Sequence, residues 1–246
     1  MPPIRLDPQS PSPAVETYLL GRIALDRFLD LQDRVAKEIG RRDDGQVCLL
    51  LCEHPEIITI GRGGSPADVR TDAVPLRTGQ IQTRWVKRGG GCLLHAPGQL
   101  AVYPIVPLRW HGFTLGEYLD RLQGGILRTL EALGIHAETR PGRYGLWGRT
   151  GQLAAFGVAV RDAVSRHGAF INVCPAMGLF RLVQTDPQHA TRMTCLVAER
   201  QGPVKMTSVR AEVVGQLTAA LGCDRYHLYT GHPWLRNDPA RSAGGY

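Results

Sequence analysis

Two strand-rich stretches, residues 47–106 and 144–174, flank one long helical pattern, and this order limits the fold more than any other feature. The helical pattern covers residues 115–133. It opens with the capping box Thr114–Glu117 (TLGE), and a glycine follows it at the position where glycine commonly ends helices. A doubly wound fold would alternate strands and helices regularly. The sequence therefore predicts an α+β fold.

The spacing of apolar residues predicts the remaining elements. Helical spacing recurs along residues 22–39 and again along residues 208–221, the second pattern ending at a glycine. Apolar and β-branched runs predict strands at Val47–Cys52, Ile57–Ile60, Gln99–Val106, Gln152–Val160 and Gly168–Val173. The run at 99–106 is apolar after Gln99, which favours a central strand.

The chain of 246 residues shows no internal linker and no repeat, so residues 14–235 are expected to form a single domain. Residues 1–13 contain five prolines and predict a loose N-terminal arm. Residues 236–246 are polar and glycine-containing and predict a C-terminal tail.

Charge and cysteine usage narrow the functional classes. The net charge is +7, from 26 arginines, 3 lysines and 22 acidic residues, but the basic residues are scattered, so nucleic acid is an unlikely partner. No apolar run approaches the ~18 residues of a membrane span, and no apolar signal core opens the chain. The six cysteines form no C-x-x-C pair, which predicts reduced thiols in the cytoplasm without a metal or cofactor.

The segment Arg88–Gln99 (RGGGCLLHAPGQ) carries the strongest indication of chemistry. Three glycines allow backbone N–H groups to approach a ligand, Arg88 supplies a fixed cation, and His95 can donate or accept a proton. The segment fits neither a P-loop nor a dinucleotide-binding turn. Taken alone, it is equally compatible with a glycine-rich hairpin.

A second segment covers Gly151–Val158 (GQLAAFGV) and Arg166–Val173 (RHGAFINV). A glycine inside each strand indicates a bulge or a close backbone approach, which suits a ligand lying across the sheet. His167, considered by itself, is more often a structural histidine than a ligand.

Together these motifs resemble the lipoyl(octanoyl) transferase family of the biotin/lipoate protein ligase fold, from about residue 16 to residue 222. The family's early E-H-P…G-R signature matches Glu53–Pro55 and Gly61–Arg62. Its hallmark R-G-G-x-x-x-x-H-G-P-G-Q matches residues 88–99, with alanine replacing one glycine, and its later H-G…N element matches residues 167–172.

The resemblance implies a central mixed or mainly antiparallel sheet with packed helices. It also implies transfer of an octanoyl or lipoyl group from acyl carrier protein to a lysine of lipoate-dependent carrier domains, in the cytoplasm. The residues expected to bind the acyl group are Arg88, Gly89, Gly90, Gly91, Cys92, Leu93, Leu94, His95, Ala155, Phe156, Gly157, His167, Gly168, Ala169 and Phe170.

The sequence differs from the family at the two positions that carry the family's catalytic groups. Gln152 occupies the position of the family's lysine, and Thr185 occupies that of its cysteine nucleophile. Glutamine carries no charge and moves no proton, and a threonine hydroxyl needs a base to attack a thioester. The resemblance therefore indicates an acyltransferase whose usual pair of catalytic groups has been replaced.

Three alternatives follow. Cys92 could be a relocated nucleophile, with His95 or His167 as its base and Lys87 as a nearby cation. The chain could instead bind an acyl group, a lipoyl group or a carrier domain without turnover. A DNA-binding regulator on a ligase-like fold is less favoured, because no helix-turn-helix extension is visible.

Overall fold

A computed structural model describes residues 14–42, 44–70, 72–185 and 191–236. Its main sheet contains β1 (Val15–Arg22), β2 (Cys48–Glu53), β6 (Gln99–Ile105), β7 (Glu138–Arg140), β8 (Arg143–Trp147), β9 (Gln152–Arg161), β10 (Val164–Asn172) and β11 (Tyr226–Thr230). The strand order is β11-β1-β2-β6-β10-β9-β8-β7. Only β1 pairs in parallel, with β2 and with β11, and the other neighbours are antiparallel. The predicted α+β fold with a mixed, mainly antiparallel sheet is confirmed.

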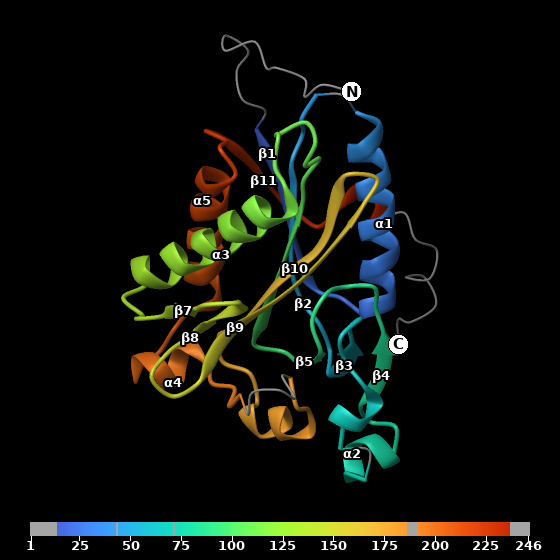
Figure 1. Cartoon of the computed structure of the whole chain (residues 1–246), viewed down its shortest axis with the longest axis vertical. Coiled ribbons are helices and arrows are strands. Elements are labelled where there is room, and N and C mark those ends of the chain that lie inside the picture. Colours follow the sequence, from blue (N-terminus) through green and yellow to red (C-terminus); the bar gives the residue numbers. More distant parts are fainter. Residues whose placement is uncertain (1–13, 43, 71, 186–190, 237–246) are drawn as a thin grey trace.

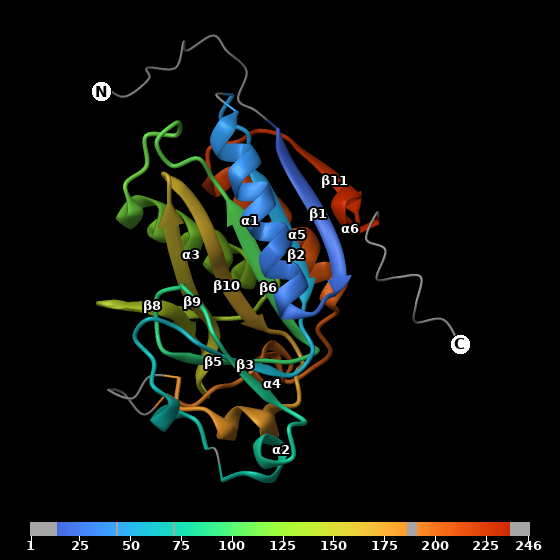
Figure 2. The same cartoon turned by 90° about the vertical axis from the view of Figure 1, so that its right-hand side faces the viewer.

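Helices cover both faces of this sheet. The helix α1 (Leu25–Arg41) lies on one face, and α3 (Leu115–Ala132) and α5 (Met206–Ala220) lie on the other (Figures 1 and 2). Along β2, Leu49 and Leu51 pack in the core under α3 and α5, whereas Leu50 packs in the core under α1. Successive residues of β2 therefore pack on opposite faces of the sheet and are apolar from Cys48 to Cys52, since neither face meets water there.

A second, three-stranded sheet lies at one end of the main sheet (Figure 1) and has the order β4-β3-β5. Its strands are β4 (Gln82–Trp85), β3 (Ile57–Ile60) and β5 (Cys92–His95), and short helices are found at Pro66–Asp68, α2 (Val74–Arg77), Met177–Leu182, α4 (Leu196–Arg200) and α6 (Pro233–Arg236). The Gly89 N–H donates to the Val158 carbonyl oxygen at 2.8 Å. This bond ties the glycine-rich segment 88–91 to β9, at the junction of the two sheets.

Three elements begin at other residues than the sequence predicted. The helix expected at 22–39 begins at Leu25, because β1 continues to Arg22. The strand expected at 168–173 begins at Val164, and the helix expected at 208–221 begins at Met206. The predicted arm at 1–13 lies outside the described residues, as does the predicted tail except for Arg236, which ends α6.

Among the described residues, no helix is long and apolar enough to cross a membrane. In the same part of the chain, no cluster of three or more His, Cys, Asp or Glu side chains could hold a metal ion.

Candidate functional site

Arg88 lies buried beneath the glycine-rich segment, with its side chain only 1% exposed. Its guanidinium donates to the carbonyl oxygens of Gly89 (3.0 Å), Gly91 (2.9 Å) and Thr59 (3.0 Å), and to the Thr59 hydroxyl at 2.7 Å. No carboxylate in the described part of the chain pairs with it. Burial lowers the pKa of Arg88 to about 10, so the group stays protonated at neutral pH. The junction therefore holds a buried positive charge with no counter-ion.

A chain of buried hydrogen bonds leads away from this charge. The Thr59 hydroxyl, which accepts from Arg88, lies 2.9 Å from Nε2 of His95, and Nδ1 of His95 lies 3.0 Å from Oε1 of Gln99. Gln99 Nε2 donates to Oδ1 of Asn172 at 2.9 Å. These partners assign the proton to Nδ1 of His95 and make its Nε2 an acceptor.

The far end of this chain reaches the main sheet beside Gln152. Nδ2 of Asn172 donates to the Thr194 carbonyl oxygen at 3.0 Å, and the Thr194 N–H donates to the Gln152 carbonyl oxygen at 2.9 Å. The bonds from Arg88 to the Thr194 carbonyl oxygen all run in the same direction, an arrangement in which successive hydrogen bonds strengthen one another, and the Thr194 N–H belongs to a separate peptide group. Burial, the neighbouring His54 and Arg88 hold the pKa of His95 well below its usual range. His95 is thus a neutral positioning residue with both ring nitrogens in use.

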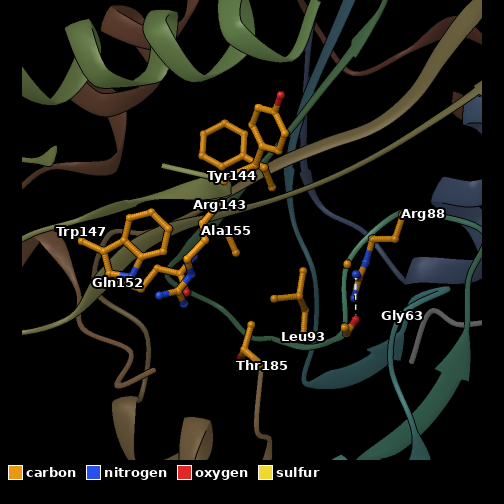
Figure 3. Close-up of a pocket in the computed structure, with 13 residues that line it drawn as sticks. Gly63, Arg88, Leu93, Arg143, Tyr144, Trp147, Gln152, Ala155 and Thr185 are labelled. Atoms are coloured by element: carbon orange, nitrogen blue, oxygen red, sulfur yellow. Dashed lines mark hydrogen bonds between the residues drawn. The ribbon is translucent and has the colours of Figure 1, made fainter. Parts of the chain in front are cut away.

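A pocket of about 390 Å³ opens between the glycine-rich segment, β8, β9 and Thr185. Its lining residues are Gly63, Arg88, Gly90, Gly91, Leu93, Gly142, Arg143, Tyr144, Trp147, Gln152, Ala155, Phe156 and Thr185. Figure 3 shows Trp147 and Gln152 toward one end, Arg88 and Gly63 toward the other, and Leu93 and Thr185 between them. The structure therefore brings eight of the predicted site residues together in one cavity.

Gln152 is the first residue of β9, and its side chain is 5% exposed. Nε2 donates to the carbonyl oxygen of Ala154 at 3.1 Å. Because a backbone carbonyl can only accept, this bond fixes the orientation of the amide and turns Oε1 the other way. Oε1 has no hydrogen-bond partner among the described residues. The position thus presents an acceptor with no ionisable group.

Thr185 is held by the segment that precedes it. The Gln184 N–H donates to the Asp68 carbonyl oxygen at 2.8 Å. The carbonyl oxygen of Thr185 lies directly over Gly91, where a Cβ atom would approach it to 2.6 Å. Gly91 therefore lacks a side chain because the backbone of Thr185 occupies that space.

The residues missed by sequence reasoning come mostly from the β7–β8 hairpin. They are Gly63, Gly142, Arg143, Tyr144 and Trp147. Trp147 is 2% exposed, and Arg140 and Arg143 lie 5.0 Å and 4.8 Å from its ring centroid. The available signal was the alternation of arginine, glycine and tryptophan at 143, 145 and 147, since alternate strand residues share a face.

Cys92, which was expected to bind the acyl group or to act as a relocated nucleophile, does not line the pocket. Strand alternation directs Leu93 into the cavity, whereas Cys92 and Leu94 pack on the other face against the core that contains Phe180. The Cys92 thiol donates to the Ser65 carbonyl oxygen at 3.3 Å, and burial together with Asp68 raises its pKa. The geometry does not favour Cys92 as a relocated nucleophile.

The other predicted residues do not line the pocket. Some of them contact the residues that line it, and others lie elsewhere. A Cβ atom at Gly157 would approach Cδ of Arg88 to 2.8 Å, so this glycine makes room for the buried arginine. The Phe170 ring meets the His95 ring edge-on, with centroids 4.6 Å apart. Gly89, Gly168 and Ala169 do not line the pocket either. His167 and Lys87 line a different cavity on the α1 side.

The chemistry of the first pocket is defined by what its described lining residues contain. They supply two guanidinium groups, a phenol, an indole N–H, an amide and a hydroxyl, but no thiol, aliphatic amine, imidazole or carboxylate. Leu93, Ala155, Phe156 and Trp147 form an apolar surface between them. The pocket can therefore hold an apolar chain that ends in a polar carbonyl, but it has no evident general base.

Comparison with known proteins gives a consistent result. Residues 27–220 match the family model described as the lipoyl protein ligase A/B catalytic domain. An octanoyltransferase of Roseiflexus sp. (strain RS-1) is 34% identical over 228 residues, covering 91% of this chain and 94% of the relative. An octanoyltransferase of Geotalea uraniireducens (strain Rf4) is 35% identical over 194 residues, covering 79% and 87%.

Solved structures agree on the fold. A lipoate-protein ligase A bound with ATP has a TM-score of 0.69 at 15% identity, covering 89% of this chain and 90% of that one. A bi-partite lipoate protein ligase from Thermoplasma acidophilum has a TM-score of 0.65 at 16% identity, covering 89% and 88%.

Proposed function

Because this chain belongs to the octanoyltransferases of the lipoyl protein ligase A/B family, we propose that its first pocket binds an octanoyl or lipoyl group. The acyl donor would be acyl carrier protein, and the acceptor would be a lysine of a lipoate-dependent carrier domain. Both partners follow from the family.

The observation that carries the proposal is the meeting of Gln152 and Thr185 in one pocket with the Arg88 segment. The cavity of about 390 Å³ falls within the range of ~300–1,000 Å³ usual for small-molecule sites. Burial of an octanoyl chain contributes ~0.8 kcal/mol for each CH₂ group removed from water. Leu93, Ala155 and Phe156 offer the apolar surface for that burial.

The polar groups of the pocket suit the other end of the ligand. The buried charge of Arg88 attracts a carbonyl oxygen as it gains negative charge. Oε1 of Gln152 can accept a hydrogen bond from an incoming amine. These groups position reactants, and none of them supplies a covalent intermediate as readily as a thiolate would.

A second candidate function is binding without turnover. It is favoured by the absence of any thiol, amine or imidazole among the described lining residues. In that case the chain would hold an acyl group or an acylated carrier domain and leave its transfer to another protein.

Intact-mass spectrometry tests both candidates together. The protein is incubated with octanoyl-acyl carrier protein and an apo lipoyl domain, and all three masses are followed with time. Octanoylation of the lipoyl domain supports transfer. Unchanged masses with a thermal shift from octanoate support binding alone. Unchanged masses with no thermal shift at millimolar octanoate would contradict the acyl pocket itself.

A further inference from the structure

A second pocket of about 460 Å³ lies between α1, β4 and the hairpin of β9 and β10. Its lining residues are Leu29, Gln32, Asp33, Arg62, Arg84, Trp85, Val86, Lys87, Ala159, Val160, Arg161, Arg166 and His167. None of these residues lines the first pocket. The two cavities are separated by the glycine-rich segment, because Lys87 faces one and Arg88 faces the other.

The second pocket carries a large surplus of positive charge. Five of its lining side chains are cationic, whereas Asp33 is its single carboxylate. Arg84 pairs with Asp26 at 2.9 Å, Arg161 with Asp162 at 3.5 Å, and Arg166 with Asp33 at 3.1 Å. Arg62 and Lys87 have no carboxylate partner within the described residues. The pocket therefore combines fixed, paired arginines with cations that remain available to a ligand.

His167 is the feature that distinguishes this pocket from a solvated basic surface. It is 7% exposed, yet its ring has no hydrogen-bond partner among the described residues. Its backbone has a φ of 58°, an uncommon conformation for a residue with a side chain. The Gln32 Oε1 atom accepts from its N–H at 2.7 Å and holds it there. The neutral ring therefore offers one N–H donor to the cavity, and the surrounding cations favour a ligand that accepts hydrogen bonds and carries negative charge.

We propose that this pocket binds a phosphate-bearing group. Phosphate offers several acceptor oxygens and a charge that matches guanidinium and ammonium donors converging from different elements. Trp85, 61% exposed at the rim, offers a flat apolar surface for an organic portion of the ligand. The ligand is a free phosphate compound or the phosphopantetheine arm of an acyl donor. The site shares no lining residue with the first pocket. A free phosphate compound would be a ligand beyond acyl transfer, whereas the phosphopantetheine arm rests on the proposed function.

Trp85 and His167 provide direct readouts of this binding. Inorganic phosphate, AMP and coenzyme A are titrated at constant ionic strength. Tryptophan fluorescence is recorded together with the ring ¹⁵N resonances of the histidines. We expect saturable changes in both signals, with the fluorescence change lost in Trp85→Phe. None of these probes carries an acyl group, so the result is independent of acyl transfer.

Two double variants that remove the same charge show whether the probes bind to this pocket or respond to the overall charge of the protein. Arg62→Gln with Lys87→Gln should weaken binding at least tenfold. Arg128→Gln with Lys205→Gln removes the same charge from exposed positions outside the pocket and should leave binding unchanged. Displacement of coenzyme A by 4′-phosphopantetheine at lower concentrations than AMP identifies the phosphopantetheine source, because both competitors carry a single phosphate, and the reverse order identifies a free phosphate compound. Equal weakening in both double variants, or no response to any probe, overturns the proposal.

Discussion

At the scale of single residues, Arg88 and Gln152 differ in how far their buried polar groups are paired, since Nε of Arg88 and Oε1 of Gln152 have no hydrogen-bond partner among the described residues. The Arg88 guanidinium donates hydrogen bonds to three backbone carbonyl oxygens and one hydroxyl. Gln152 donates to Ala154 and leaves its acceptor unpaired. One residue therefore builds the pocket, and the other is positioned to contact what enters it.

Replacement of Arg88 by methionine should destabilise the protein by about 2–3 kcal/mol, because several buried carbonyl oxygens lose their donor. Urea denaturation measures this change. Arg88→Lys should recover little of the loss, since one ammonium cannot reach acceptors placed around a planar guanidinium. Full stability in either variant would contradict the structural role of this side chain.

The positions of Gln152 and Thr185 lead to a gain-of-function prediction. Gln152→Lys combined with Thr185→Cys should yield a covalent octanoyl adduct after incubation with octanoyl-acyl carrier protein, whereas either change alone should not. Cysteine alone stays mostly protonated near its usual pKa of ~8.5, and lysine alone has no thiol to activate. Peptide mapping after intact-mass analysis locates the adduct. An equally strong adduct on the Thr185→Cys variant would show that another group activates the thiol.

At the scale of elements, α3 and α5 illustrate how a glycine can serve packing. Gly125 of α3 faces α5, where a Cβ atom would approach Cδ2 of Leu217 to 2.6 Å and Cβ of Ala220 to 3.2 Å. Its neighbour Gly124 meets only the tip of Arg128, at 3.4 Å. The two glycines share one helix but differ in their surroundings.

Gly124→Ala should stabilise the protein by roughly 0.5–1 kcal/mol, because alanine loses less entropy than glycine in a helix. Gly125→Ala should be destabilising by ~1–3 kcal/mol, because overpacking of Leu217 outweighs the same gain. Chemical denaturation of both variants under identical conditions measures the difference. Equal effects would mean that α3 and α5 do not pack as closely as described.

The elements also show what could be predicted from the sequence. The helix after Thr114 was predicted well because its caps are local signals. The short exposed strand β11 has no buried face that would impose alternation, so no pattern marked it. Arg88 and Gln152 were assigned to the site by motif. Trp147 was missed, because its place depends on hairpin register. His167 lines the second cavity and not the first, and this position depends on β10 pairing and its φ of 58°.

At the scale of the whole molecule, two covered sheet faces and the junction with the small sheet bury several histidines in neutral form. His54 is 1% exposed, donating from Nδ1 to the Ile23 carbonyl oxygen and accepting from the Tyr103 hydroxyl at 2.7 Å. Burial lowers the pKa of His54 to about 4 and that of His167 to about 3, and it holds the pKa of His95 far below its usual range.

These shifts predict a loss of stability in mild acid. A histidine whose pKa is lower in the folded state binds protons more tightly when unfolded, so its contribution is complete above about pH 6.5 and is lost as pH falls. His54 alone should cost on the order of 2 kcal/mol between pH 7 and pH 5. Urea denaturation across this range measures the slope. His54→Phe should make the slope shallower, the exposed His136→Gln should not, and a flat profile would contradict the neutral burial.

The chain of hydrogen bonds from Arg88 to Gln152 begins and ends on residues that line the same cavity. Walls tied together in this way are already ordered in the free protein, so little conformational entropy is lost when a guest enters. For a ligand that fits, the binding free energy gained from burying its surface is therefore not offset by a cost of ordering the pocket. A ligand that is too wide would have to displace the pocket walls, and this would break several of the buried hydrogen bonds. We therefore expect the pocket to select ligands by their shape.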